Sequence, residues 1–255
     1  MSELDWIRLA RTPLAIALTI VIAVVYPLLG WRRFRRLAAQ PEPIARATRL
    51  GLYGNIVVSQ WSLVLATGLV LGAVGPGLVT IGQHAGLVPL RTALVAGALL
   101  VGFALLSRLT LAQLARASAG DLPGHVRKAG RILPRDGVER AGFLPVAITA
   151  GICEEILYRG WLPLVLAAWT GSLAIGFAGA AVVFGLGHAY QGRSGVILTG
   201  TLGLFLGAVT WWTGSLVPGQ LLHVAVDLVN GLAVGATLAR LGNETLPLQP
   251  IRIDP

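Results

Sequence analysis

The chain has 255 residues, of which 55% are apolar and 12% charged, with a net charge of +9 and a mean hydropathy of +0.75. A soluble protein of this length needs far more charge on its surface, so a soluble enzyme, a secreted disulfide scaffold and a disordered chain are excluded. The single cysteine, Cys153, forms neither an internal disulfide nor a pair of metal ligands. The excess of arginine indicates the positive-inside bias of membrane loops, with no nucleic-acid partner.

The apolar segments predict an all-α, polytopic membrane helical bundle of about seven transmembrane helices, within a range of six to eight. Residues 12–31 form an uncharged run of 20 residues, enough to cross a hydrocarbon core of about 30 Å. A cleaved signal peptide is the alternative, but the run ends in the basic cluster 32–36 and not in a small-residue cleavage site. We therefore expect a retained first span.

The next two spans are expected near 52–73 and 92–107, separated by a loop rich in glycine and proline at 74–90. The polar stretch 108–142 follows and contains seven basic residues. Four more spans are expected between about 143 and 240, with breaks near 170–172, 191–194 and 213–218.

Alternation across seven spans places the segments 32–49, 108–142 and 190–194 and the tail after 240 on one side of the membrane. Nearly all loop arginines lie in these segments. The positive-inside rule therefore predicts a multi-pass cell-membrane protein with its N-terminus outside and its C-terminus in the cytoplasm. The 19 arginines against one lysine favour a bacterial or archaeal source.

Ionisable residues within the expected spans are confined to the last four. Such groups are costly in lipid and indicate a functional site by default. They are Glu154, Glu155 and Arg159 in the fourth span, His188 in the fifth, and His223 and Asp227 in the seventh. We expect them to converge on one buried polar cavity, whereas His84 and His125 are expected in loops, in contact with water.

The spacing of these residues suggests their partners. Glu155 and Arg159 are four apart, which favours a helical ion pair. Glu154 is turned by about 100° from Glu155 on a helix, so it can keep an unpaired carboxylate. His223 and Asp227 are also four apart, so that the carboxylate can fix the imidazole tautomer or share an ion with it. Each pair alone could be structural, but a free carboxylate with two imidazoles suits water activation and oxyanion stabilisation.

Three segments resemble the signature motifs of the CPBP family: EExxxR at 154–159, FxxxH at 184–188 and HxxxD at 223–227. This family groups the CAAX proteases and bacteriocin-processing intramembrane proteases, is also called Abi, and includes the type II CAAX prenyl endopeptidases. The resemblance covers about residues 140–240. The third motif ends in Asp227 where the eukaryotic endopeptidases carry asparagine, which affects the role of that residue.

The resemblance implies an intramembrane endopeptidase that hydrolyses a peptide bond in a membrane-associated protein or peptide. Glu154 and His188 would activate the attacking water, and His223 and Asp227 would stabilise the oxyanion or complete the polar site. Glu155, Arg159 and Phe184 would support the site. The enzyme would use either no cofactor or a divalent metal such as Zn²⁺, with Glu154, His188 and His223 as its ligands.

The same resemblance divides the chain into three parts. They are the N-terminal spans with the basic cytoplasmic loop at 1–140, a catalytic helical core at 141–242 and a cytoplasmic tail at 243–255. Two other functions stay open: a non-catalytic immunity or scaffold protein of the same family, and a proton-coupled transporter. A transporter often has an internal repeat, and the sequence has none that is visible.

The predicted topology can be tested with single cysteines at Gln40 and Asp121. A membrane-impermeant maleimide should label both only after the membrane is opened, because both segments are expected in the cytoplasm. Ser172→Cys in an opposite loop should be labelled in intact cells, and the wild type, whose only thiol is Cys153, gives the background. Labelling of positions 40 and 121 in intact cells would contradict the topology.

Overall fold

The computed structural model describes residues 3–40, 44–73, 77–83, 89–116, 118 and 123–243, which form helices and no strand. Within these described residues, six helical stretches are long and apolar enough to cross a membrane: Pro13–Ala38, Arg46–Gly72, Leu90–Arg116, Gly137–Thr170, Arg193–Thr213 and Val217–Leu241. The remaining expected span corresponds to α9 (Leu173–Gly187), whose 15 residues are shorter than a full span. The prediction of an all-α membrane bundle is confirmed.

The helices extend further than the apolar runs that predicted them. The second span, α4, covers Arg46–Gly72, and the third, α5, covers Leu90–Arg116. The fourth begins with α7 (Gly137–Glu155), because the side chain of Asp136 caps the helix by accepting a hydrogen bond from the Glu139 N–H at 2.9 Å. This N–H, with a smaller effect from Arg46, lowers the pKa of Asp136.

The first span consists of α2 (Pro13–Ile20), a π-helical turn (Val21–Val25) and α3 (Tyr26–Ala38). The short helix α1 (Glu3–Ala10) precedes it, and the sequence had not suggested this helix. It packs against α8 (Leu162–Thr170), where the Trp169 indole donates to the Ala10 carbonyl at 2.9 Å.

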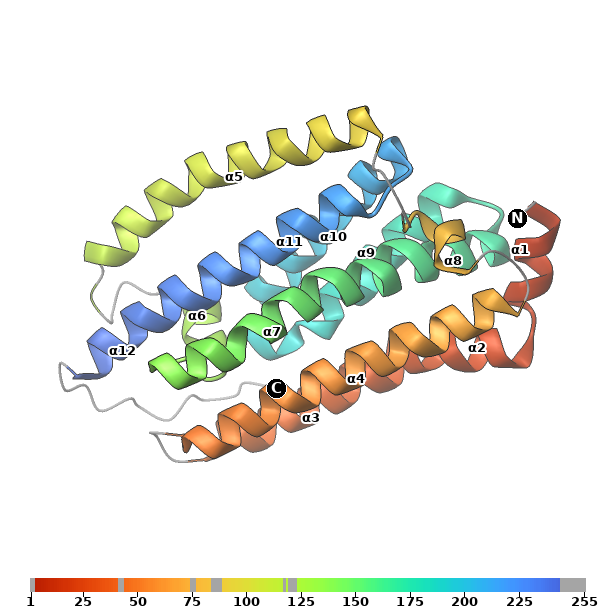
Figure 1. Ribbon diagram of the computed structural model, residues 1–255. Coiled ribbons are helices and arrows are strands. Elements are labelled where there is room, and N and C mark those ends of the chain that lie inside the picture. Colours follow the sequence, from red (N-terminus) through yellow and green to blue (C-terminus); the bar gives the residue numbers. More distant parts are fainter. Residues whose placement is uncertain are drawn as a thin grey trace.

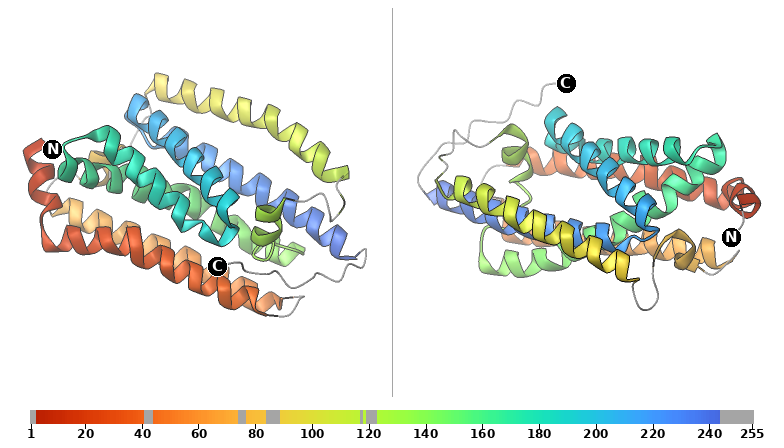
Figure 2. Two further views of the ribbon diagram at one scale, coloured as in Figure 1. Left: turned by 180° about the vertical axis from the view of Figure 1, so that it is seen from behind. Right: turned by 90° about the horizontal axis from the view of Figure 1, so that it is seen from above.

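The central element of the bundle is α7, which packs against α4 on one side and α11 (Val217–Val229) on the other. It continues through a π-helical turn (Ile156–Trp161) into α8, which packs against α9. Helix α9 in turn packs against α10 (Arg193–Thr213), while α5 packs against α11 and lies at the outer edge of the bundle (Figures 1 and 2).

One hydrophobic core joins the two halves of the chain. It includes Ile22 and Leu71 of the first two spans together with Leu157 and Trp161 of the fourth. The Trp161 indole donates to the Thr19 hydroxyl at 3.1 Å, which ties the fourth span to the first. The division at residue 140 stays a prediction, and the tail predicted at 243–255 lies outside the described residues beyond Asn243.

The arginine-bearing C-terminal end of α1 lies elsewhere, but four other helix ends that carry arginine gather at one end of the bundle. These are the C-terminal ends of α3, α5 and α12 (Gly235–Asn243) and the N-terminal end of α4 (Figure 1). The protein is therefore a multi-pass membrane protein with a basic end, which we expect to face the cytoplasm.

Helices α7 and α11 approach each other closely at Gly151, where a Cβ atom would lie 2.7 Å from the backbone nitrogen of Val224. Gly151→Ala should therefore separate the two helices and lower the free energy of unfolding by about 1–3 kcal/mol. Thermal unfolding in detergent measures the change. The control is Gly54→Ala in α4, where no atom lies within 4 Å of the added methyl group. Equal stability of the two variants would contradict the prediction.

Candidate active site

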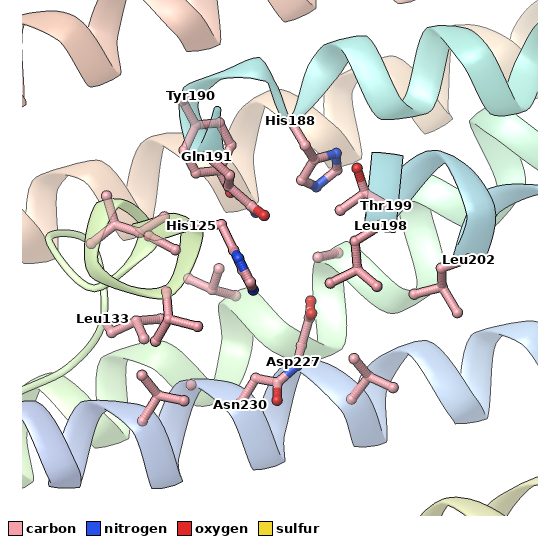
Figure 3. A pocket seen from close by; sticks show the side chains of 18 of the residues that line it. His125, Leu133, His188, Tyr190, Gln191, Leu198, Thr199, Leu202, Asp227 and Asn230 are labelled. Atoms are coloured by element: carbon pink, nitrogen blue, oxygen red, sulfur yellow. The ribbon is translucent and has the colours of Figure 1, made fainter. Parts of the chain in front are cut away.

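A cavity of about 1320 Å³ lies between the helices and is lined by residues from both halves of the chain. Its polar lining includes Tyr26, Gln60, Glu154, His188, His223 and Asp227. Figure 3 shows His188 and Asp227 on opposite sides of this space, with their side chains directed into it. Glu155 and Arg159 are not among the lining residues and lie buried behind it.

Glu155 and Arg159 form the ion pair that their spacing predicts. The Arg159 Nη1 atom lies 3.0 Å from Glu155 Oε1, and the two residues are 2% and 0% exposed. Two glycines give them room: a Cβ at Gly219 would lie 2.9 Å from Glu155 Oε2, and one at Gly203 would lie 3.2 Å from Arg159 Nη2. The guanidinium carbon also lies 4.1 Å from the centre of the Phe184 ring, so Phe184 contributes a cation–π contact.

His223 connects this ion pair to the cavity. Its Nδ1–H donates to Glu155 Oε1 at 2.8 Å, which leaves Nε2 facing the cavity. From there Nε2 lies 3.8 Å from both Glu154 Oε2 and Asp227 Oδ2. The carboxylate that orients the imidazole is therefore Glu155 of α7, and Asp227 approaches the other nitrogen.

Glu154 is directed away from the ion pair, as the helical geometry predicts. One oxygen, Oε1, accepts a hydrogen bond from the Gln60 amide at 2.8 Å. The other, Oε2, has no hydrogen-bond partner among the described residues and is the oxygen that faces His223. Glu154 thus presents one fixed and one available oxygen to the cavity.

His188 follows the last residue of α9 and caps that helix. Its Nδ1–H donates to the Phe184 carbonyl at 2.9 Å. Because a carbonyl oxygen only accepts, Nδ1 carries the proton and Nε2 of the neutral ring is left as an acceptor. Phe184 therefore contacts both Arg159 through its ring and His188 through its backbone.

The expectation that His125 lies in a loop was wrong. It belongs to α6 (Gly124–Ala129), which packs against residues 189–191 after α9, and it lines the cavity (Figure 3). A helix of six residues inside a polar stretch leaves no hydrophobic period by which it could be predicted. His84 lies outside the described residues.

Three π-helical turns in the described part of the chain adjoin the cavity. They are Val21–Val25 before Tyr26, Ile156–Trp161 after Glu155, and Asn230–Val234 shortly after Asp227. Such turns occur frequently at functional sites, because the extra residue redirects the side chains around it. A period of 3.6 residues predicts none of them.

The donor set does not fit a metal site. Within the ranges that the structure describes, no three His, Cys, Asp or Glu side chains are arranged to hold a metal ion. A zinc site needs at least three ligands at about 2 Å, and Glu154, His188 and His223 do not converge in this way. We derive no catalytic step through a metal.

Residues 138–229 match the family model of the type II CAAX prenyl endopeptidase, Rce1-like. This segment is therefore similar to the CAAX protease family. It contains the two carboxylates, Arg159, Phe184, both cavity histidines of the motifs and Asp227, so the family assignment made from the three motifs is confirmed. No curated protein and no solved structure is significantly similar to the chain. The first 137 residues, including Gln60, lie outside the matched segment.

The buried ion pair predicts a structural effect of Arg159. Arg159→Ala leaves the Glu155 carboxylate without its guanidinium, and breaking a buried pair in this way costs about 3–5 kcal/mol. We expect a lower folded yield and a lower melting temperature in detergent. Arg193→Ala, an exposed arginine at the start of α10, is the matched control and should unfold like the wild type. A normally stable Arg159→Ala protein would show that the pair is not needed for folding.

Proposed function

We propose that the chain is an intramembrane endopeptidase that hydrolyses a peptide bond in a membrane-associated protein or peptide. The observation that supports this most is that Glu154, His188 and His223 line the same cavity between membrane-spanning helices, with His223 Nε2 3.8 Å from Glu154 Oε2. The family of residues 138–229 supports the same reaction class. The apolar side chains that also line the cavity, such as Leu198 and Leu202, suit an apolar segment of a substrate.

In the proposed reaction, Glu154 and His188 hold one water molecule. Glu154 Oε2 takes a proton from the water as its oxygen attacks the peptide carbonyl carbon, and Nε2 of His188 accepts a hydrogen bond from the same water. The carbonyl oxygen becomes the oxyanion of a tetrahedral intermediate. When the C–N bond breaks, Glu154 returns its proton to the leaving nitrogen, so that one carboxylic acid and one amine are formed.

His223 is the proposed oxyanion donor. Its Nδ1–H is held by Glu155, and in the proposed reaction the ring is also protonated at Nε2, which donates to the oxyanion. Asp227 approaches the same nitrogen and completes the polar wall of the site. Glu155 and Arg159 act indirectly: they hold His223 and the helix that carries Glu154 in position.

Glu154→Gln tests the proposal directly. Glutamine keeps the volume but cannot accept a proton, so turnover should fall by about two to four orders of magnitude while the melting temperature is unchanged. The purified protein in phosphatidylcholine liposomes is given a library of fluorogenic membrane peptides, with and without a strong chelator.

Two results would count against this assignment. Near wild-type cleavage by Glu154→Gln, together with a well-folded but inactive Glu155→Gln variant, would exchange the roles of the two carboxylates. If both variants cleave normally, the protease function is wrong, and a non-catalytic membrane protein or a transporter becomes the better explanation.

A further inference from the structure

Gln60 is a buried polar residue in the second span, where most of the other side chains within the membrane are apolar. It lies in α4, is 2% exposed, and its Nε2 donates to Glu154 Oε1 at 2.8 Å. The two residues are 94 positions apart, and Gln60 lies outside the segment that matches the CAAX protease family. Burying a primary amide costs free energy that its hydrogen bonds must offset. We therefore expect the bond to Glu154 to have a role that an apolar side chain could not fill.

The hydrogen bond acts on the orientation of the carboxylate. A glutamate carboxyl group rotates freely about its last torsion, because that torsion has only broad minima. With Oε1 held by Gln60, Oε2 is the oxygen that faces His223 Nε2 at 3.8 Å. A neutral amide achieves this without adding a cation beside Glu154, and a cation would make a carboxylate a weaker proton acceptor.

Gln60 could instead serve to hold α4 against α7, but other contacts already join these two helices. The Trp61 indole donates to the Thr149 hydroxyl at 3.1 Å, next to Gln60 in sequence. At the basic end, Arg49 and Glu139 form a buried ion pair at 2.5 Å between the same two helices. The helix contact therefore does not depend on Gln60.

We infer that Gln60 is a positioning residue of the proposed reaction: it fixes one oxygen of Glu154 so that the other is presented to water. This inference rests on the proposed protease function. It extends the site into the N-terminal spans, which carry none of the ionisable residues in the family motifs.

The test compares Gln60→Met with Thr149→Val in liposomes, using the library peptide that the wild type cleaves fastest. Methionine keeps the shape of glutamine without its donor, so kcat should fall by roughly 10- to 100-fold, the scale of one hydrogen bond to a charged group. KM and the melting temperature should stay close to wild type. Thr149→Val removes the neighbouring α4–α7 hydrogen bond and should keep its kcat. A wild-type kcat in Gln60→Met, or an equal loss in both variants, would overturn the inference.

A second variant, Gln60→Asn, distinguishes loss of the hydrogen bond from misfolding. Gln60→Asn keeps a buried amide but withdraws the donor by one methylene group, so it should lose kcat like Gln60→Met. Full activity in Gln60→Asn would also overturn the inference. In the Glu154→Gln background, Gln60→Met should cause no further loss, because a positioning residue acts only through its partner. A further loss there would assign Gln60 a role independent of Glu154.

Failure of the inference is distinct from failure of the proposed function. If Glu154→Gln is inactive while Gln60→Met matches the wild type, the protease function holds and only the role of Gln60 is lost. If the wild type cleaves no peptide, or Glu154→Gln cleaves normally, the proposed function fails and the inference about Gln60 fails with it.

Discussion

The Glu155 carboxylate is the charge on which the arrangement of the last four spans depends. It is fully buried, and it is shared by Arg159 of its own helix and His223 of α11. An ionised carboxylate at membrane depth is tolerated only when partners compensate it. Any separation of α7 from α11 would remove the imidazole from this charge. The close approach of the helices at Gly151 and Gly219 follows from the same requirement.

Two adjacent carboxylates serve different purposes because a helix directs consecutive side chains to different faces. Glu155 is directed inward to Arg159, whereas Glu154 is directed to the cavity and to Gln60. The π-helical turn that begins at Ile156 follows both. His223 joins them, since one of its nitrogens binds Glu155 and the other faces Glu154. A single imidazole thus lies between the buried ion pair and the carboxylate that we propose to be reactive.

Local spacing predicted what lies within one helix and failed between helices. The Glu155–Arg159 pair could be predicted because residues four apart are neighbours on any helix. The same rule suggested Asp227 as the partner that orients His223, but the structure places Glu155 there, 68 residues away. Neither this contact nor that of Gln60 with Glu154 leaves a periodic signal, because both depend on how α4, α7 and α11 pack. Helix α6 with His125 was missed because six residues are too few for a hydrophobic period.

The matched segment contains the motif residues of the candidate site, but the N-terminal spans supply part of their surroundings. Tyr26 and Gln60 line the cavity, Thr19 accepts the indole N–H of Trp161, and Ile22 packs in the core beside Leu157. In lipid, helices associate through hydrogen bonds and close packing, since lipid tails are as apolar as the side chains themselves. Polar contacts between the halves therefore contribute to folding as well as to the site. Replacing Glu155 should therefore affect both folding and the proposed reaction, because its carboxylate joins α7 to His223 of α11. Replacing Glu154 should affect the proposed reaction alone, because its second oxygen has no hydrogen bond in the described structure.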